Sequence, residues 1–363
     1  MAEIFTVRCK GCGASVVYEP GTESLKCPYC GAQEEIPAQY EGIQEIDLEE
    51  ALRAAQPARE ALPEHKVLFC ASCGAQIAYR EARAKCDFCG AEAVSEKALT
   101  EQPVRPQGVL PFALSPEEAQ QVFQTWLKNL WFAPNDLRQR SRIQELRGVY
   151  LPLWTFDAQV EAHWSAIPGY YRTRTVQYYD SAAREWRTRT ETYVEWGLPV
   201  SGVHRDFYDD VLISGFQSLP TRYIDEIGGF ATTTDLRAYE PRYFLGWDVA
   251  LPDKPLPDAW QEGHKRIQDL TAEACKRAIP GDTYRDFQMR MRLWDLTTKL
   301  AYVPIYILAY RYGGKPYRVV IHGRTGVVAG DRPISWIKVT LFVVALGAIV
   351  GLIAYWASGG KSW

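Results

Sequence analysis

Two stretches near the start of the chain share one pattern: Cys9-Lys10-Gly11-Cys12-Gly13 and Cys27-Pro28-Tyr29-Cys30-Gly31. Fourteen residues separate these two Cys-x-x-Cys-Gly knuckles, which is enough for a short hairpin. Four thiolates on two tight turns suit the tetrahedral, sulfur-rich coordination of Zn²⁺, and a closed shell leaves no position for catalysis. The glycine after each second cysteine supplies a positive φ, which lets backbone N–H groups face the sulfurs. The stretch predicts a zinc ribbon with ligands Cys9, Cys12, Cys27 and Cys30.

The pattern returns as Cys70-Ala71-Ser72-Cys73-Gly74 and Cys86-Asp87-Phe88-Cys89-Gly90, now with twelve residues between the knuckles. Iron, a redox dithiol or disulfides are alternatives, but two spaced pairs in tandem are more typical of structural zinc. Both units carry a tyrosine after the first knuckle, Tyr18 and Tyr79, which indicates a duplicated ribbon. We therefore predict two structural Zn²⁺ ions per chain, the second bound by Cys70, Cys73, Cys86 and Cys89.

Near the other end, the run from Val339 to Ala357 contains nineteen residues and no charge. About twenty apolar residues are needed for a helix to cross a bilayer. Trp336 precedes the run and Tyr355 and Trp356 close it, as expected for aromatic residues at both interfaces. A buried core helix is the alternative, but core helices of this length usually keep a polar face. We predict a transmembrane helix over residues 336–357.

The flanking charges predict the orientation of this helix. Arg324, Arg332 and Lys338 precede it and only Lys361 follows it, which favours a cytosolic N-terminal part. Zinc-binding thiolates also require a reducing compartment, and the N-terminus has no apolar signal-peptide core. The sequence thus predicts a tail-anchored membrane protein whose N-terminal part lies in the cytosol, with residues 358–363 as its extracytoplasmic tail.

Within the predicted helix, Gly347 and Gly351 form a Gly-x-x-x-Gly pair, which Ala354 and Ser358 extend. Small residues on one face let a second helix approach closely in lipid. The pair is a candidate association face for a membrane protein partner or a second copy of the chain. Small residues are also common in membrane helices that associate with nothing.

Composition sets the domain boundaries and the fold class. All twelve tryptophans follow residue 106, so the packed core should begin near there. Helical periodicity follows Ser115 up to Pro134 and recurs over residues 259–278, and apolar strands are predicted over 149–156 and 301–308. We predict small Cys₄ zinc ribbons, an α+β main domain and one transmembrane helix. The predicted segments are zinc ribbon 1 (1–40), an acidic helical linker (41–64), zinc ribbon 2 (65–99), a Pro-rich linker (100–109) and the α+β domain (110–332).

Each predicted apolar strand follows a helix and carries Tyr-x-Pro, as Tyr150-Leu151-Pro152 and Tyr302-Val303-Pro304. This recurrence predicts that the α+β domain consists of two repeated halves. A long hairpin is also predicted, with strands 170–179 and 185–196. One face of it alternates arginine with aromatic residues and is a candidate anionic-ligand face, for nucleic acid or lipid headgroups, although a solvated face has the same pattern. Its arginines are Arg172, Arg174, Arg187 and Arg189.

These features together resemble bacterial membrane-anchored proteins with tandem zinc ribbons of the transcription-factor-IIB type, which are often labelled primosomal-protein-N′-like. The resemblance rests on the cysteine knuckles and on Leu110-Pro111-Phe112, Gly148–Trp154, Phe207–Leu212, Ser218-Leu219-Pro220 and Tyr317–Pro333. Some of these proteins are associated with PspA-type membrane-stress proteins. The resemblance implies a scaffold at the inner face of the membrane.

Catalysis is not indicated. The helicase label requires a phosphate-binding loop, but in its nearest match, Gly360-Lys361-Ser362, the first glycine is replaced by Tyr355. Cys275 is predicted to be a buried thiol, and we find no small-molecule substrate site. A second group of polar residues could hold a hard cation or form a solvated loop: His204, Asp206, Asp209 and Asp210.

We therefore expect a non-enzymatic adaptor or scaffold. The alternative is a membrane-tethered nucleic-acid-binding protein, since zinc ribbons bind nucleic acids with basic knuckles and exposed aromatics such as Tyr29 and Phe88. The net charge of −3 and the acidic first ribbon disfavour phosphate binding.

Overall fold

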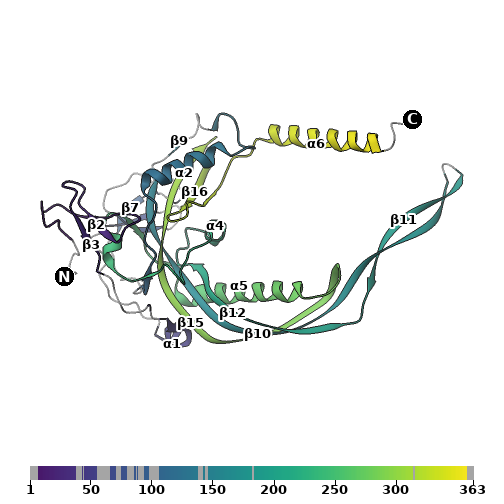
Figure 1. The fold of residues 1–363 in the computed structure, drawn as a ribbon, viewed down its shortest axis with the longest axis horizontal. Coiled ribbons are helices and arrows are strands. Elements are labelled where there is room, and N and C mark those ends of the chain that lie inside the picture. Colours follow the sequence, from purple (N-terminus) through teal and green to yellow (C-terminus); the bar gives the residue numbers. More distant parts are fainter. Residues whose placement is uncertain are drawn as a thin grey trace.

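The computed structural model describes residues 7–37, 43, 45–54, 66–70, 75–79, 86, 88, 94–97, 106–137, 142–143, 146–181, 184–313 and 315–357. Within these residues the chain is a mixed α+β protein dominated by sheets (Figure 1). A three-stranded sheet contains β1 (Val17–Tyr18), β2 (Ser24–Lys26) and β3 (Gln33–Glu35). The helices are α1 (Leu48–Arg53), α2 (Pro116–Lys128), α4 (Thr221–Ile227), α5 (Leu256–Arg277) and α6 (Trp336–Ala357), with a 3₁₀ turn η1 (Pro241–Phe244).

A large sheet of fourteen described strands forms the body. Its short strands before the first long one are β4 (Ile46–Asp47), β5 (Lys66–Cys70), β6 (Gln76–Tyr79), β7 (Val94–Lys97), β8 (Gly108–Val109) and β9 (Arg142–Ile143). The strands that follow are β10 (Arg147–Asp180), β11 (Glu185–Trp196), β12 (Val200–Ser214), β13 (Arg237–Ala238), β14 (Asp248–Ala250), β15 (Thr283–Tyr312), β16 (Lys315–His322) and β17 (Val328–Gly330).

The antiparallel pair of β10 and β15 is the spine of this sheet, in register from Arg147 opposite Ile307 to Gly169 opposite Thr283. Every residue from Val149 to Phe156 is buried, as a continuous apolar run requires when both faces of a strand are covered. Both strands are far longer than predicted, because beyond this core they continue with alternating burial and form a ribbon.

The long strands curve strongly, and α5 lies on the concave side of the curve (Figure 1). Its apolar face, including Ala259, Ile267 and Cys275, packs on Val160 and Ala162 of β10 and their neighbours. The register between β10 and its partners shifts around Asp157, on both the β12 and the β15 side. Such bulges bend a sheet and re-aim its side chains.

The two Tyr-x-Pro motifs lie opposite each other near the Arg147 end of the spine. Leu151 lies opposite Val303, and each tyrosine lies opposite the proline of the other motif. Each motif also has a short parallel neighbour, β14 beside Tyr150 and β8 beside Tyr302. This register relates the two motifs by an approximate two-fold axis through Leu151 and Val303.

Both ribbons pack on the body. In the first ribbon (residues 7–37), Tyr18 donates its backbone N–H to Leu245 O and its hydroxyl to Phe112 O. Tyr18 and Cys27 belong to the same apolar core as Phe112 and Trp247. In the second ribbon, β6 pairs with β14 of the body, so β5, β6 and β7 extend the large sheet.

Three segment boundaries differ from the prediction. Gly108 and Val109, expected in the Pro-rich linker, are buried and form β8 within the sheet. Ile46–Asp47, expected in the acidic linker, pairs with β15 as β4. Helix α2 begins at Pro116 with Ser115 as its N-cap, but it ends at Lys128 rather than continuing to Pro134, because Asn129 already closes its last turn.

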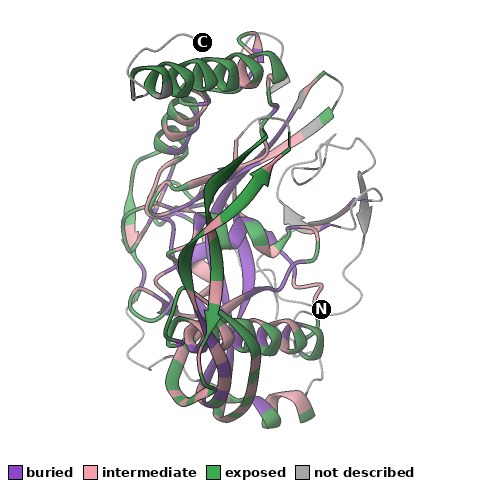
Figure 2. Ribbon diagram, turned by 90° about the vertical axis from the view of Figure 1, so that its right-hand side faces the viewer, coloured by how far each residue is buried: buried purple, intermediate pink, exposed green. Residues whose placement is uncertain are grey.

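Two arms leave the body on the same side: α6 and the hairpin formed by β11 with the outer part of β10 (Figure 1). The hairpin has the predicted strands, and β10 extends one residue further, to Asp180, which lies opposite Glu185. Exposed residues cover both arms along most of their length (Figure 2).

Candidate metal centre

The two knuckles of the first ribbon adopt the same backbone conformation. Gly13 and Gly31 have φ values of 74° and 75°, as the sequence predicts for these turns. In each knuckle the glycine donates its N–H to the carbonyl of the first cysteine, at 2.9 Å. The first cysteine in turn donates its N–H to the alanine that follows the glycine, at 2.8 Å. The two turns therefore present their cysteines in equivalent positions.

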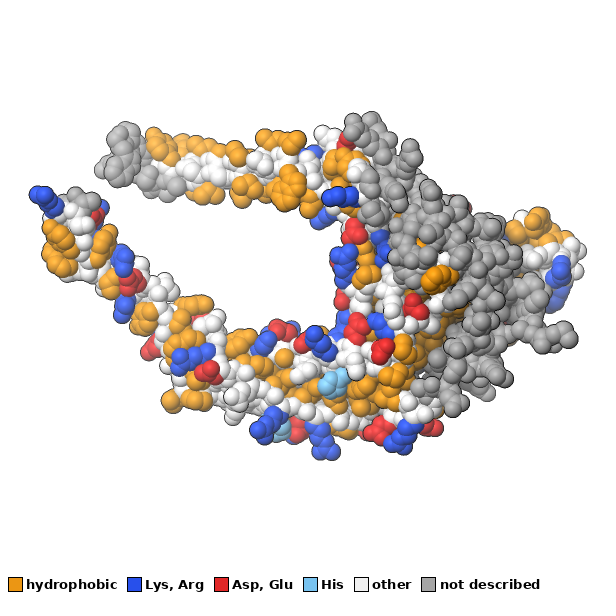
Figure 3. All heavy atoms as spheres, turned by 180° about the vertical axis from the view of Figure 1, so that it is seen from behind, with side chains coloured by type: hydrophobic (Ala, Val, Ile, Leu, Met, Phe, Trp, Pro, Cys, Tyr) orange, Lys and Arg blue, Asp and Glu red, His pale blue; other side chains and the backbone are white. Residues whose placement is uncertain are grey.

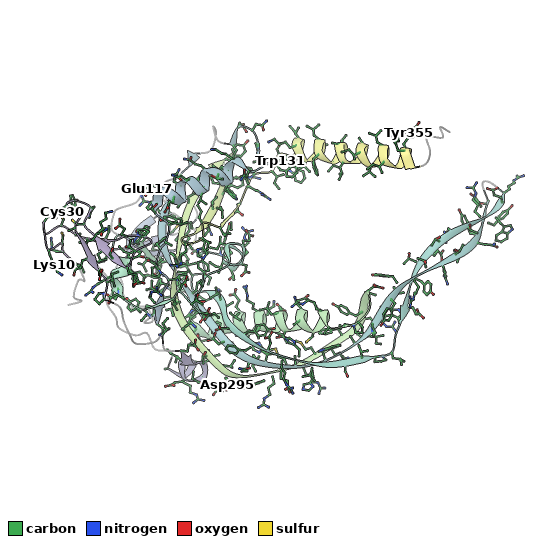
Figure 4. The ribbon with its side chains drawn as sticks, viewed as in Figure 1. Lys10, Cys30, Glu117, Trp131, Asp295 and Tyr355 are labelled. Carbon is green, nitrogen blue, oxygen red and sulfur yellow. The ribbon has the colours of Figure 1, made fainter. Side chains whose placement is uncertain are left out.

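The ligand atoms of Cys9, Cys12, Cys27 and Cys30 all lie within 4.8 Å of one another. The Cys9 and Cys30 sulfurs are 3.4 Å apart, and those of Cys12 and Cys27 are 3.5 Å apart. A tetrahedral shell with metal–sulfur bonds of about 2.3 Å places its sulfurs about 3.8 Å apart. The four cysteines thus fit one metal ion, with two of them buried and two exposed at the outer end of the ribbon, where Figure 4 labels Cys30.

Hydrogen bonds around the four sulfurs shift the pKa values of their thiols in different directions. The backbone N–H of Cys30 favours the thiolate of Cys27 and lowers its pKa to about 6. A backbone hydrogen bond from Ala32 lowers the pKa of Cys30, but the neighbouring sulfurs outweigh it and raise this pKa to about 12. Four adjacent sulfurs cannot all ionise without a compensating cation. A bound metal ion would supply that charge.

The second ribbon shows part of the same design. Cys70 donates its N–H to Ala75 O at 2.9 Å, which is the contact seen in both knuckles of the first ribbon. Cys70 and Cys86 are both buried. Their predicted partners Cys73 and Cys89 lie outside the described residues. Phe88, the aromatic of the last knuckle, is fully buried against Phe216, with ring centroids 4.6 Å apart.

A second group of candidate ligands lies where the sheet bends. The carboxylates of Asp157, Asp209 and Asp210 lie within 4.8 Å of one another, but His204 instead lies 3.7 Å from Asp206. The sequence therefore indicated the two adjacent aspartates correctly, and it missed Asp157. The remaining members come from other segments, and we call the whole set the Lys299 cluster: Lys299, Asp157, Asp209, Asp210 and Glu45.

Lys299 neutralises part of this negative charge. Its side chain is 4% exposed, and its Nζ lies 2.7 Å from Asp210 Oδ1 and 2.9 Å from Glu45 Oε1. Although burial alone would lower the pKa of Lys299, its hydrogen bond to Asp210 raises it. Asp157 accepts the N–H of Asp210 at 2.6 Å, and burial raises the pKa of Asp157 to about 6. The cation among these carboxylates is therefore the side-chain ammonium group of Lys299.

The predicted anionic-ligand face lies on the hairpin arm, with all four arginines ion-paired. Two pairs cross the ladder, Arg172 with Glu195 at 2.8 Å and Arg174 with Glu191 at 3.4 Å. Arg187 and Arg189 pair with Glu185 and Glu191, at 2.7 and 2.6 Å. An anionic ligand would have to compete with these carboxylates.

Helix α6 is long and apolar enough to cross a membrane. Its window Trp336–Ile353 has a mean hydropathy of 2.3, and none of it is buried against the described part of the chain. Near its start, Lys338 donates to the backbone carbonyl of Trp131, whose own side chain is 82% exposed. Figure 4 shows Trp131 at this end of α6 and Tyr355 at the other. No local pattern indicated Trp131, because only a tertiary contact brings it to the start of α6.

The two glycines of the predicted association face lie in the middle of α6. A Cβ atom added at Gly347 or Gly351 would meet nothing within 4 Å. Within the described residues, that face is therefore open to a second helix.

Comparison with known proteins identifies a relative along nearly the whole chain. Over 342 residues it is 25% identical to the uncharacterized protein YdjG of Bacillus subtilis (strain 168), a match that covers 93% of this chain and 92% of YdjG. No family model matches the chain. No solved structure matches it.

Proposed function

We propose that this chain is a non-enzymatic zinc-ribbon adaptor, held at the cytosolic face of the bacterial inner membrane by α6. The observation that carries the proposal is the exposure of α6, a helix of 22 residues with no charge beyond Lys338. An apolar helix that keeps most of its surface exposed is stable in lipid and costly in water. The exposed side chains of Trp131 and Trp336 at its start suit a membrane interface.

The first ribbon supports a structural role for its metal. A shell of four cysteines is closed, so it leaves no open position for a substrate or an activated water. Zn²⁺ is the ion that best suits such a shell. Because the second ribbon repeats the knuckle sequence and the Cys70 contact, we propose a second zinc there. Metal analysis of the purified chain should give two zinc ions per molecule, and one or none would refute this part.

The proposed orientation can be tested in intact cells. Arg332 lies before α6 and Lys338 lies in its first turn, and cytosolic flanks of membrane helices are enriched in such residues. A protease-accessible tag in the first ribbon should be protected in spheroplasts and cleaved after lysis. Cleavage in intact spheroplasts would reverse the orientation, and recovery in the soluble fraction would remove the membrane anchor.

Nucleic-acid binding is the second candidate, because the side chain of Tyr29 is 82% exposed between two ligand cysteines. The surrounding charges oppose it, since Lys10 pairs with Glu34 and Lys26 pairs with Glu19. Phe88 is buried and unavailable for stacking. Micromolar binding of DNA or RNA with a steep salt dependence would replace the adaptor proposal with this one.

The small residues of α6 indicate the kind of partner that this chain would bind. We propose that Gly347 and Gly351 contact a helix of another membrane protein or of a second copy, through close backbone approach. Replacing both with isoleucine should leave membrane insertion intact and weaken the complex recovered after solubilisation. Ala345→Ile with Ile349→Leu, on the opposite side of the same helix, provides a matched control. An unchanged complex in the glycine variant would refute the association face.

The approximate two-fold register of the Tyr-x-Pro motifs also supports the predicted duplication of the α+β domain. We propose that β8, α2 and β10 correspond to β14, α5 and β15, since the elements follow in the same order. In each unit the short strand lies parallel to the long strand of the other unit: β8 lies beside β15, and β14 lies beside β10.

A further inference from the structure

The end of the hairpin arm carries large aromatic side chains that are exposed. Tyr178, Tyr179 and Trp186 are 37%, 51% and 70% exposed, and we call them the tip aromatics. The rings of Tyr179 and Trp186 meet edge to face at 5.6 Å. Apolar side chains, in orange, are visible at the end of this arm in Figure 3. A two-stranded ribbon gains little stability alone, so aromatic exposure at its end favours a contact outside the described fold.

The charge of the hairpin disfavours a strongly anionic surface as its partner. The hairpin from Tyr170 to Trp196 holds five arginines and four carboxylates, a net charge of +1. The four arginines nearest the ladder centre are already ion-paired. The arm therefore offers aromatic surface more than free positive charge.

The direction of the arm identifies the surface that it can reach. The hairpin leaves the body on the same side as α6 and extends as far as the C-terminal end of that helix (Figures 1 and 3). When α6 enters a bilayer, that bilayer is the surface beside the arm. The ion-paired ladder and the unpaired strand edges cannot enter hydrocarbon. The arm can therefore touch only the interfacial layer, a contact that requires α6 to be inclined to the arm in the membrane.

We propose that the tip aromatics lie in the interfacial layer of the bilayer that α6 spans, as a second membrane contact of the same chain. Tyrosine and tryptophan favour this layer, where an apolar ring is shielded and its polar atom stays hydrated. The proposal rests on the membrane anchoring proposed above. It gives the near-neutral hairpin a reason to end in aromatic residues, and it places the body between two attachment points.

The test uses the full chain reconstituted in phosphatidylcholine vesicles. A fluorescent amino acid is introduced at Ser181, at Lys10 or at Val344, and nitroxide groups are carried on lipid headgroups or at the middle of the acyl chains. We expect headgroup nitroxide to quench the label at Ser181, mid-chain nitroxide to quench Val344, and neither to quench Lys10. The quenching at Ser181 should not change between low and high salt.

Replacing Tyr179 and Trp186 together by serine should lower the population in membrane contact by roughly tenfold, as the loss of two partly buried aromatics implies. Thr188→Ser with Thr190→Ser, on the same strand, is the matched control and should change nothing. An unquenched Ser181 beside a quenched Val344 overturns the tip contact alone. An unquenched Val344 overturns the anchor and the tip contact together. Quenching at Ser181 that disappears at high salt assigns the membrane contact to the arginines and overturns the aromatic lipid contact.

Discussion

The four-cysteine group of the first ribbon and the Lys299 cluster both collect groups of like charge, but they differ in what balances that charge. No cation among the described residues lies within the four sulfurs, so their ionisation depends on an ion from solution. In the Lys299 cluster the counter-charge is a side chain, 2.7 Å from Asp210. The four cysteines need a metal ion to balance their charge, whereas the charge of the Lys299 cluster is balanced by the fold itself.

Removing a ligand of the metal should have the largest effect. Cys27→Ser should abolish metal binding at the first site, where apparent binding free energies of structural zinc are about 10–16 kcal/mol and are also folding energy. Because Cys27 and Tyr18 share a core with Phe112, we expect the damage to reach the body. Metal content should fall from two ions to one, and hydrogen exchange should accelerate in residues 7–37 and in the strand before α2.

Cys275→Ala is the control for this change. Cys275 is a buried cysteine on α5 and belongs to no described metal group. It should keep the full metal content and lose only packing, about 1 kcal/mol. Loss of metal in the control, or its retention in Cys27→Ser, would contradict the assignment of the first site.

The sequence was sufficient to predict one site and not the other. The cysteines of each knuckle are three residues apart, and the glycine after them fixes the turn, so local spacing encodes the site. The Lys299 cluster draws Glu45, Asp157, Asp210 and Lys299 from four segments. Their meeting depends on strand registers and on bulges beside Asp157, which no local pattern encodes.

The same limit applies to the fold. Alternation of residues was enough to predict the two strands of the hairpin, although the pairing of Asp180 with Glu185 lies one residue beyond the predicted strand 170–179. Continuous apolar runs were enough to predict the central strands of the spine. The curvature that sets α5 inside the long strands arises from bulges and packing between distant segments. The docking of both ribbons on the body depends on contacts such as Tyr18 with Phe112, across 94 residues.

Removing the internal cation should have the next largest effect. Lys299→Met leaves Asp210 and Asp157 buried without their counter-ion, which typically costs about 3–5 kcal/mol. The free energy of unfolding, measured with denaturant, should fall by that amount while both metals stay bound. Lys10→Met, which breaks an exposed ion pair with Glu34, should cost well under 1 kcal/mol.

The double variant Lys299→Met with Asp210→Asn should recover much of the loss, because it removes the unpaired charge as well. Failure to recover would mean that Lys299 acts through packing of its stem. Release of metal in Lys299→Met would mean that the two sites are not independent.

The pH dependence of stability should distinguish the sites further. Burial raises the pKa of Asp157 from 3.8 to about 6, so the folded state holds this proton more tightly than the unfolded chain. The contribution is present below about pH 4 and is lost as the pH rises through about 6, by up to about 3 kcal/mol. Asp157→Asn should remove this component, visible as the difference between the two stability curves.

The cysteine site should respond in the opposite direction, since acid protonates thiolates and releases metal. The comparison of wild type with Asp157→Asn cancels this shared effect. Parallel curves for the two proteins between pH 4 and 6 would show that Asp157 does not titrate in this range.

The smallest effect is expected at Glu45, which joins the segment between the ribbons to the Lys299 cluster. Glu45→Gln weakens the contact with Lys299, and because the Glu45 side chain is 41% exposed, we expect a loss of about 1 kcal/mol or less. Hydrogen exchange should accelerate in β4 and α1 and stay unchanged in the first ribbon. Glu49→Gln, which breaks an exposed pair with Arg53 on the same helix, should have less effect on β4. If Glu45→Gln instead released metal or loosened residues 7–37, the two sites would be coupled through the intervening segment. The contrast between a site completed by a metal and a site completed by the fold would then describe one cooperative unit.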